Sequence, residues 1–317
     1  MEEQRKQGTY KGIMDEYRAG GRKTNVPNRP THPIDDLRVF DTATGEIIQG
    51  YDIRRTTTDA QRIGHNARKT NEEIDRLGFY WAIIHDGGDH MAKLSDAEMG
   101  RFIYLMTFAS YDSGDESGGI VLQFDNGRRM TRKHIEETMK LGASAFKSFM
   151  ASIRKHDFIT PISKEDGGGF RVNTEHFYRG TGIAKKVNDG QRFTRIFREN
   201  VRNIYLAMEP KQHRYLGMIY KLLPHIHYSQ NVLVYNPTET NYTELNALMM
   251  STIAEILGYE NVKDARQLLR KIVIDDRPLF KYTQSNDGKD EFVMVNPFVV
   301  YGGGDVELAV LRTIFSI

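Results

Sequence analysis

Apolar residues recur at helical spacing in two long stretches of the chain, and the first of these begins near residue 95. Ser95 and Glu98 have the spacing of a capping box, which satisfies free backbone N–H groups at the start of a helix. Met99, Phe102 and Met106 then fall on one face of the helix that follows. Downstream, the pattern predicts a strand over 120–124, a helix from Thr131 stopped by Gly142, a third helix over 143–156, and strands at 158–162 and 170–172 around a glycine-rich tip.

The second stretch repeats this succession in the same order. Its predicted elements are a helix over 212–223, a strand over 232–235, a helix over 243–257 stopped by Gly258, a third helix over 262–274, and strands at 279–283 and 291–295. Short motifs also match between the stretches at a slowly growing offset: Arg101-Phe102 with Arg214-Tyr215, 120–122 with 232–234, Leu141-Gly142 with Leu257-Gly258, and Val172-Asn173 with Val295-Asn296. Since chance matches would not keep a roughly constant offset through several elements, we interpret the chain as an internal duplication.

Helix, strand, helix, tight turn, helix and hairpin is the order of a winged helix. The predicted fold class is therefore α+β, mainly helical, with two tandem winged-helix domains joined by a helix and preceded by an N-terminal arm and a small hairpin/helix extension. The extension has strand patterns at 37–40 and 46–48, a polar helix at 59–77 and an apolar run at 79–84. The predicted domains are a flexible basic arm at 1–34, the extension at 35–94, winged helix 1 at 95–182, the connecting helix at 188–209 and winged helix 2 at 210–317.

Composition narrows the class of protein without naming a function. The 317 residues are 39% hydrophobic and 27% charged, which is typical of a globular protein. No run approaches the roughly 18 apolar residues of a membrane span, so we expect no membrane partner. The polar N-terminus does not look like a signal peptide. The absence of cysteine excludes disulfides and thiolate metal sites and fits a cytoplasmic location.

The net charge of +2 is small, but the cations are concentrated in the middle of the chain. Two stretches, 128–155 and 179–202, are rich in lysine and arginine and contain few carboxylates. Such a distribution favours a surface that faces a polyanion. Taken one at a time, each stretch is also compatible with an ordinary solvated helix face.

The second helix of a helix-turn-helix pair enters the DNA major groove, so the third helix of each repeat is the candidate reader of bases. Small and basic residues lie opposite its apolar face in the first repeat, and basic or amide residues do so in the second. Flanking and hairpin cations are candidates for phosphate contacts. The candidate DNA-binding residues are Arg128, Arg129, Arg132, Ser144, Lys147, Ser148, Arg154, Lys155, Lys164 and Arg171 in the first repeat, and Lys263, Arg266, Gln267, Arg270, Lys271 and Lys281 in the second.

Enzyme signatures are weak by comparison. His225-Ile226-His227 matches the spacing of metal-dependent nickases that start rolling-circle replication, with Tyr228 or Tyr242 as a possible nucleophile. The motif is short, and it falls where the repeat requires a connection. No phosphate-binding loop that ends in Gly-Lys-Ser/Thr and no His-Glu-x-x-His motif occurs. We therefore expect a protein that is not an enzyme and has no catalytic residues, metal or cofactor.

The chain from about residue 79 to 317, including Thr131-Arg132-Lys133-His134-Ile135 and His156-Asp157-Phe158-Ile159, resembles the plasmid and phage replication initiators built from two winged helices. The resemblance lies in architecture and local pattern, and the first hundred residues depart from it. It implies binding to repeated origin sequences, with each winged helix in one major groove on the same face of the DNA. It also implies that Lys147, Arg154, Arg266 and Arg270 are among the DNA contacts, and that the protein switches between dimer and monomer.

The sequence thus predicts a sequence-specific binder of double-stranded DNA, most simply a replication initiator of a mobile element. The expected partners are duplex DNA, a second copy of the chain on DNA, and host replication or transcription proteins. Two alternatives stay open: a transcriptional regulator with the same DNA-binding parts, and an interaction module in which a winged helix binds protein. An apolar or acidic outer face on either third helix would favour the interaction module.

Overall fold

The computed structural model describes residues 39–40, 47–48, 78–85, 93–111, 119–180, 183, 191–274, 277–284 and 291–315. The chain divides into two units, Met1–Lys69 and Thr70–Ile317. In the first unit, β1 (Val39–Phe40) and β2 (Ile47–Ile48) pair antiparallel, so the predicted hairpin is confirmed. The predicted arm at 1–34 and the helix at 59–77 lie outside the described residues.

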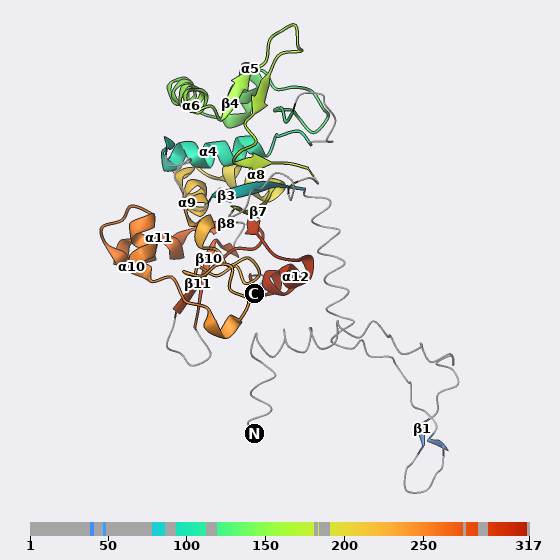
Figure 1. The fold of residues 1–317 in the computed structure, drawn as a ribbon, viewed down its shortest axis with the longest axis vertical. Coiled ribbons are helices and arrows are strands. Elements are labelled where there is room, and N and C mark those ends of the chain that lie inside the picture. The colour runs from blue at the N-terminus through green and yellow to red at the C-terminus, as the bar shows by residue number, and fades with distance from the viewer. Residues whose placement is uncertain are drawn as a thin grey trace. The chain divides into compact units, whose positions relative to one another are not determined.

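The second unit combines helices with antiparallel sheets, which confirms the α+β class (Figure 1). Its first half contains β3 (Phe79–His85), α4 (Asp96–Met106), α5 (Arg132–Met139), α6 (Ala143–Lys155), β4 (Ile159–Pro161), β5 (Phe170–Val172) and β6 (Phe177–Tyr178). Its second half contains β7 (Gln191–Phe197), α8 (Arg198–Ala207), α9 (Arg214–Leu222), η3 (Leu223–His225), η4 (Tyr242–Glu244), α10 (Met250–Ile256) and α11 (Val262–Lys271). The chain then continues with β8 (Val273–Ile274), β9 (Arg277–Pro278), β10 (Phe280–Gln284), β11 (Glu291–Val295), β12 (Val300–Tyr301) and α12 (Asp305–Phe315).

Each half follows the order helix, short bridged segment, helix, helix and hairpin. In the first half, Val121 bridges to Arg171 in β5 of the β4–β5 hairpin. In the second half, Val232 bridges to Met294 in β11 of the β10–β11 hairpin. The short segment therefore adds to the second hairpin strand in both halves.

The two halves share one four-stranded sheet with the order β12-β7-β3-β6. Trp81 of β3 pairs with Tyr178 of β6, and Arg195 of β7 pairs with Tyr301 of β12. Trp81 and Arg195 are also paired directly with each other across β3 and β7. Corresponding positions that face each other are the mark of a two-fold arrangement, so an approximate two-fold axis passes between Trp81 and Arg195.

Helices α4 and α9 cross with the same reciprocity. A Cβ atom on Gly100 would lie 1.8 Å from the carbonyl oxygen of His213, and a Cβ atom on Gly217 would lie 2.0 Å from that of Asp96. Each carbonyl belongs to the residue four positions before the other glycine. Gly100 therefore corresponds to Gly217, and our match of Arg101 with Arg214 is displaced by about one helical turn.

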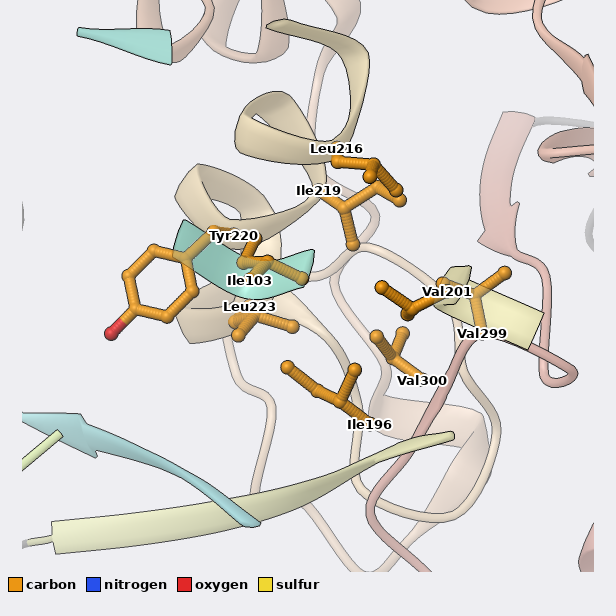
Figure 2. A pocket seen from close by; sticks show the side chains of 9 residues that line it. All are labelled: Ile103, Ile196, Val201, Leu216, Ile219, Tyr220, Leu223, Val299 and Val300. Carbon is orange, nitrogen blue, oxygen red and sulfur yellow. The ribbon is translucent and has the colours of Figure 1, made fainter. Parts of the chain in front are cut away.

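The core between the halves is formed where these helices cover the sheet. Figure 2 shows the apolar side chains that converge there around a cavity of about 10 Å³, which has room for about one water molecule. This interior is packing and not a ligand pocket. The lining residues are Ile103, Ile196, Val201, Leu216, Ile219, Tyr220, Leu223, Val299 and Val300.

The connecting helix is shorter than predicted. Residues Gln191–Phe197 form strand β7, and the helix starts at Arg198. Phe193, Ile196 and Phe197 would share a helix face, but β3 supplies a seven-residue partner that satisfies this backbone as a strand. The predicted domain boundaries at 94 and 188 place β3 and β7 in the extension and the connecting helix, although both strands belong to the shared sheet.

Smaller differences concern the ends of helices. The residue in the left-handed conformation after α5 is Lys140, at φ 48°, while Gly142 begins α6 with φ −63°. Gly258, at φ 75°, does follow α10 as predicted. In place of the helix predicted over 243–257, the structure has η4 and the shorter α10, and Ala247 between them bridges to Val234. Helix α12 was not predicted. No helix in the described part of the chain is both long enough and apolar enough to cross a membrane.

Candidate nucleic-acid interface

Helices α5 and α6 form the candidate DNA-binding unit of the first half. The hydroxyl oxygen of Thr131 accepts from the backbone N–H of His134, and the His134 ring accepts from the backbone N–H of Thr131, which fixes the start of α5. The Lys140 turn then directs the chain into α6. The inner face of α6 is fully buried through Phe146, Phe149, Met150 and Ile153, so the opposite face is oriented outward.

All the candidate residues on α6 lie on that outward face. No described carboxylate lies within ion-pair distance of its three cations, which are therefore free to meet an anionic partner. Small neighbours leave room for close approach of a duplex. The exposed candidates are Ser144, Lys147, Ser148, Arg154 and Lys155.

The arginines before α5 and at its first position differ in their surroundings. Arg132 is exposed, with its guanidinium 5.2 Å from the centre of the Phe146 ring. Arg128 is exposed, with Nη2 3.1 Å from Nε2 of His134. Arg129 is engaged within the protein, because its Nη1 donates to the carbonyl oxygens of Asp166 and Gly168 at 2.5 and 3.4 Å. Arg128 and Arg132 are thus available as surface cations, whereas Arg129 fastens the hairpin tip.

The β4–β5 hairpin carries two of the candidates, both exposed. Lys164 lies at the tip and Arg171 on β5. Gly167, Gly168 and Gly169 all have positive φ values, which ordinary side chains rarely adopt. The tip therefore owes its shape to consecutive glycines and to the hydrogen bonds from Arg129.

In the second half, α11 is the counterpart of α6. Its own residues Ala265 and Leu269 form the buried inner face. Arg266 is half-buried, and its Nη1 lies 2.7 Å from Oε2 of Glu291 on β11. The exposed candidates on α11 are Lys263, Gln267, Arg270 and Lys271.

Lys281 does not belong with these residues. Its Nζ donates to the carbonyl oxygen of Ile314 at 2.6 Å and lies 5.3 Å from the centre of the Phe315 ring. The ammonium group thus caps the end of α12, where the helix dipole favours a cation. We exclude Lys281 from the candidate interface.

Several of the described arginines in the second basic stretch, 179–202, are turned inward. Arg195 is buried, with its guanidinium near the rings of Phe79 and Tyr301, and Arg192 donates to the carbonyl oxygen of Pro224. The interpretation of this stretch as a polyanion-facing surface is therefore wrong for Arg192 and Arg195. The lysine and arginine count was correct, but it could not show that the strand β7 lies inside the molecule.

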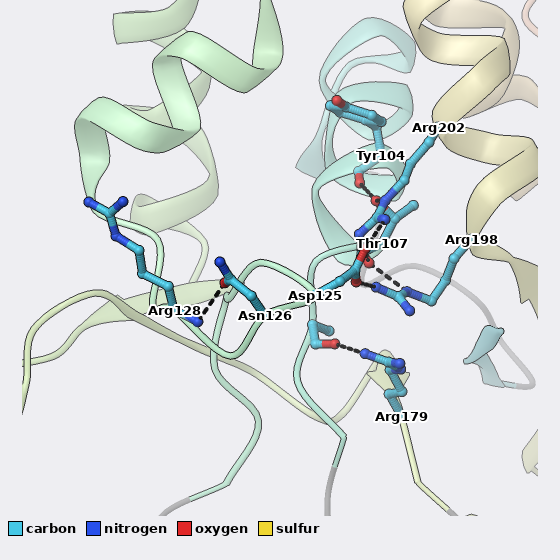
Figure 3. Close-up of polar contacts among 9 residues, drawn as sticks. Tyr104, Thr107, Asp125, Asn126, Arg128, Arg179, Arg198 and Arg202 are labelled. Carbon is cyan, nitrogen blue, oxygen red and sulfur yellow. Dashed lines mark hydrogen bonds and ion pairs between the residues drawn. The ribbon is translucent and has the colours of Figure 1, made fainter. Parts of the chain in front are cut away.

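Arg198 and Arg202 on α8 form a clasp with Asp125 and Thr107 that the sequence did not reveal (Figure 3). Arg198 donates to the Thr107 carbonyl and to Asp125 Oδ1, each at 2.6 Å. Arg202 donates to Asp125 Oδ2 at 2.6 Å and to the Thr107 carbonyl at 2.9 Å. The hydrogen bond from Arg202, followed by that from Arg198, lowers the pKa of Asp125 to about 2. The clasp joins α8 to the end of α4.

Arg179 lies beside the clasp and donates to the carbonyl oxygen of Ala109 at 2.7 Å. Burial, together with repulsion from Arg198, lowers its pKa to about 10. These arginines hold backbone carbonyls just beyond α4 and stabilise the junction between the halves. They are structural cations, in contrast to those on α6.

The two histidines of the nickase-like motif differ in exposure, because His225 is half-buried and His227 is fully buried. His227 is fully buried, with Nε2 2.7 Å from the carbonyl oxygen of Glu239 and Nδ1 accepting from the backbone N–H of Gln230. Burial lowers the pKa values of both His225 and His227. Among the residues that the structure describes, no group of three histidine or acidic side chains is placed to hold a metal ion.

Comparison of the chain with protein-family models, curated proteins and solved structures gives no match. Its function is therefore inferred from the residues and geometry described above.

Proposed function

We propose that each half of Thr70–Ile317 is a winged helix and that the pair binds double-stranded DNA in a sequence-specific manner. One observation carries the proposal: α6 and α11 each follow a tight turn, precede a hairpin and expose a polar, basic face. An α-helix of this kind fits the major groove of B-form DNA. Within Thr70–Ile317, Figure 1 shows α6 and α11 toward the same side of the view, which is compatible with contact to one duplex.

The chemistry of the two faces supports DNA over a protein partner. The outer face of α6 is small and basic, and that of α11 carries lysine, arginine and glutamine around Asp264. Neither face is apolar or acidic, which was the condition favouring an interaction module. Cations supply affinity for phosphates, while arginine and glutamine are suited to guanine and adenine edges.

Within this class we favour a replication initiator of a plasmid or phage over a transcriptional regulator. The preference rests on the resemblance of the tandem arrangement to such initiators. The halves of the chain are unequal in sequence, which suits an asymmetric target that can be repeated in one direction. A regulator with the same parts would be expected to bind one site at a promoter.

The test is selection of bound duplexes from a random library, followed by affinity measurements from low to moderate salt. We expect one enriched sequence and a fall in affinity with salt, because phosphate contacts release counterions. No enrichment, together with a flat salt response, would contradict the proposal. Direct repeats of the enriched sequence near the gene would favour an initiator, and a single palindrome at a promoter would favour a regulator.

A further inference from the structure

The cations of α6 and α11 differ in one respect that bears on how DNA is selected. Lys147 and Arg154 on α6 are exposed and have no carboxylate partner among the described residues. Arg266 on α11 does have one, because its Nη1 lies 2.7 Å from Oε2 and 3.1 Å from Oε1 of Glu291. Both side chains of this pair are 36% exposed, so the pair lies at the surface.

Tyr282 of β10 also contacts Arg266. The guanidinium carbons of Arg266 and Arg270 lie 5.8 and 4.9 Å from the centre of the Tyr282 ring. The Tyr282 hydroxyl donates to the backbone carbonyl of Arg266 at 3.4 Å. Arginine stacked on an aromatic ring and paired with a carboxylate has few conformations open to it.

We propose that Glu291 is a specificity-determining residue that restricts Arg266 to base contacts and prevents it from gripping phosphates. This inference rests on the proposed function. Glu291 neutralises the charge of Arg266, so the pair gains little from the general negative field of DNA. No described residue accepts from Nε or Nη2 of Arg266, so these donors remain for a base edge.

Guanine is the base whose edge best fits those donors, because its O6 and N7 atoms accept two hydrogen bonds from one arginine. A phosphate group offers charge and would have to compete with the carboxylate already in place. Duplexes that lack a guanine at this position would therefore gain nothing from Arg266. The free cations of α6 contribute affinity to any sequence, whereas Arg266 contributes to one.

The test compares E291Q with wild type on the selected duplex and on an unrelated duplex of equal length. A matched control is E255Q, which removes the same charge from α10, where Glu255 is exposed and has no described ion-pair partner. We expect E291Q to bind the unrelated duplex about 3–10 times more tightly than E255Q does, because Arg266 can then reach a phosphate. The slope of log affinity against log salt should steepen by about 0.9, and discrimination between duplexes should fall.

A second pair of variants keeps the inference testable if E291Q is poorly folded. R266A leaves Glu291 as an unpaired carboxylate facing the DNA, so it should weaken binding to both duplexes. Adding E291Q to R266A should restore binding to the unrelated duplex at least to the wild-type level. The folded state of each variant is checked by its thermal unfolding.

Two outcomes separate the inference from the proposed function. If wild type binds the selected duplex but E291Q and E255Q have equal affinities and slopes on the unrelated duplex, Glu291 is only a structural partner and the inference is wrong. If wild type selects no duplex at all, the proposed function itself fails.

Discussion

Gly100 and Gly217 occupy equivalent places on two crossing helices, and each faces the backbone carbonyl four residues before the other. The backbones of α4 and α9 can approach this closely only because neither position has a side chain. The contact is the intramolecular form of a symmetric interface between two like units. It explains how two halves with little local identity are held as one unit.

Replacement of Gly100 with alanine should therefore destabilise the fold. The new Cβ atom would lie 1.8 Å from the carbonyl oxygen of His213, so the helices must separate. Overpacking of this kind typically costs about 1–3 kcal/mol. We expect a lower midpoint in chemical denaturation. The control is G142A, whose Cβ would meet nothing within 4 Å. Equal midpoints for the two variants would contradict the proposed close contact.

His213 should make stability depend on pH. Burial, with a smaller effect of Arg101, lowers its pKa from 6.5 to about 4. Between these values the unfolded chain binds a proton that the folded protein excludes. Stability that is fully present above pH 6.5 is therefore lost as the pH falls toward 4, by at most about 1.4 kcal/mol per pH unit.

The measurement for this residue is denaturation of wild type and H213F at several pH values. Phenylalanine keeps a ring that can stack on Tyr205, whose ring centre lies 3.8 Å away. We expect the difference in unfolding free energy between the two proteins to change across this pH range. The lowered pKa values of His225 and His227 affect both proteins and cancel in that difference. Curves that stay parallel would show that His213 does not titrate as described.

Tyr205 should support the α5–α6 unit at the end of its first helix. Its hydroxyl donates to the carbonyl oxygen of Met139 at 3.0 Å, at the end of α5. Loss of one buried hydrogen bond costs about 1 kcal/mol, so Y205F should lower stability by about that amount. Tyr228 is exposed and its hydroxyl has no hydrogen-bond partner among the described residues, so Y228F is a suitable control. Equal unfolding free energies for the two variants would show that this hydrogen bond does not contribute to stability.

Lys147 and Arg154 should contribute directly to DNA binding. Replacing both with alanine removes two exposed cations from the outer face of α6. We expect the binding free energy for the selected duplex to weaken by about 1–3 kcal/mol for each side chain that reads a base, and by less for one that binds a phosphate. The double variant K93A/K211A removes equal charge outside the α5–α6 unit, α11 and the hairpins, and should bind almost as wild type does. Equal losses of affinity in the two double variants would indicate only a general charge effect.

Local signals in the sequence predicted much of the fold. The capping box of Ser95 and Glu98 is present, as is the Thr131 cap, because caps are formed by residues close together in the chain. The buried face of α6 followed from its periodicity. The outward faces of α6 and α11 were predicted for the same reason.

Long-range contacts account for what the sequence could not predict. Gln191–Phe197 forms a strand because β3 lies beside it, although the two are separated by more than a hundred residues. The sequence pattern predicts exposed side chains for Lys281 and Arg129. In the folded chain, Lys281 caps α12 and Arg129 hydrogen-bonds the tip of the β4–β5 hairpin. The pairing of Arg266 with Glu291 joins a helix to a hairpin strand and has no local signature.

The central claim is that two equivalent helices read one duplex, and chemical footprinting on the selected sequence tests it most directly. We predict protection of guanine N7 atoms in two major grooves on one face of the DNA, separated by about one helical turn. Loss of protection in one groove should follow K147A/R154A, and in the other R270A. Protection of a single groove, or of none, would contradict the claim.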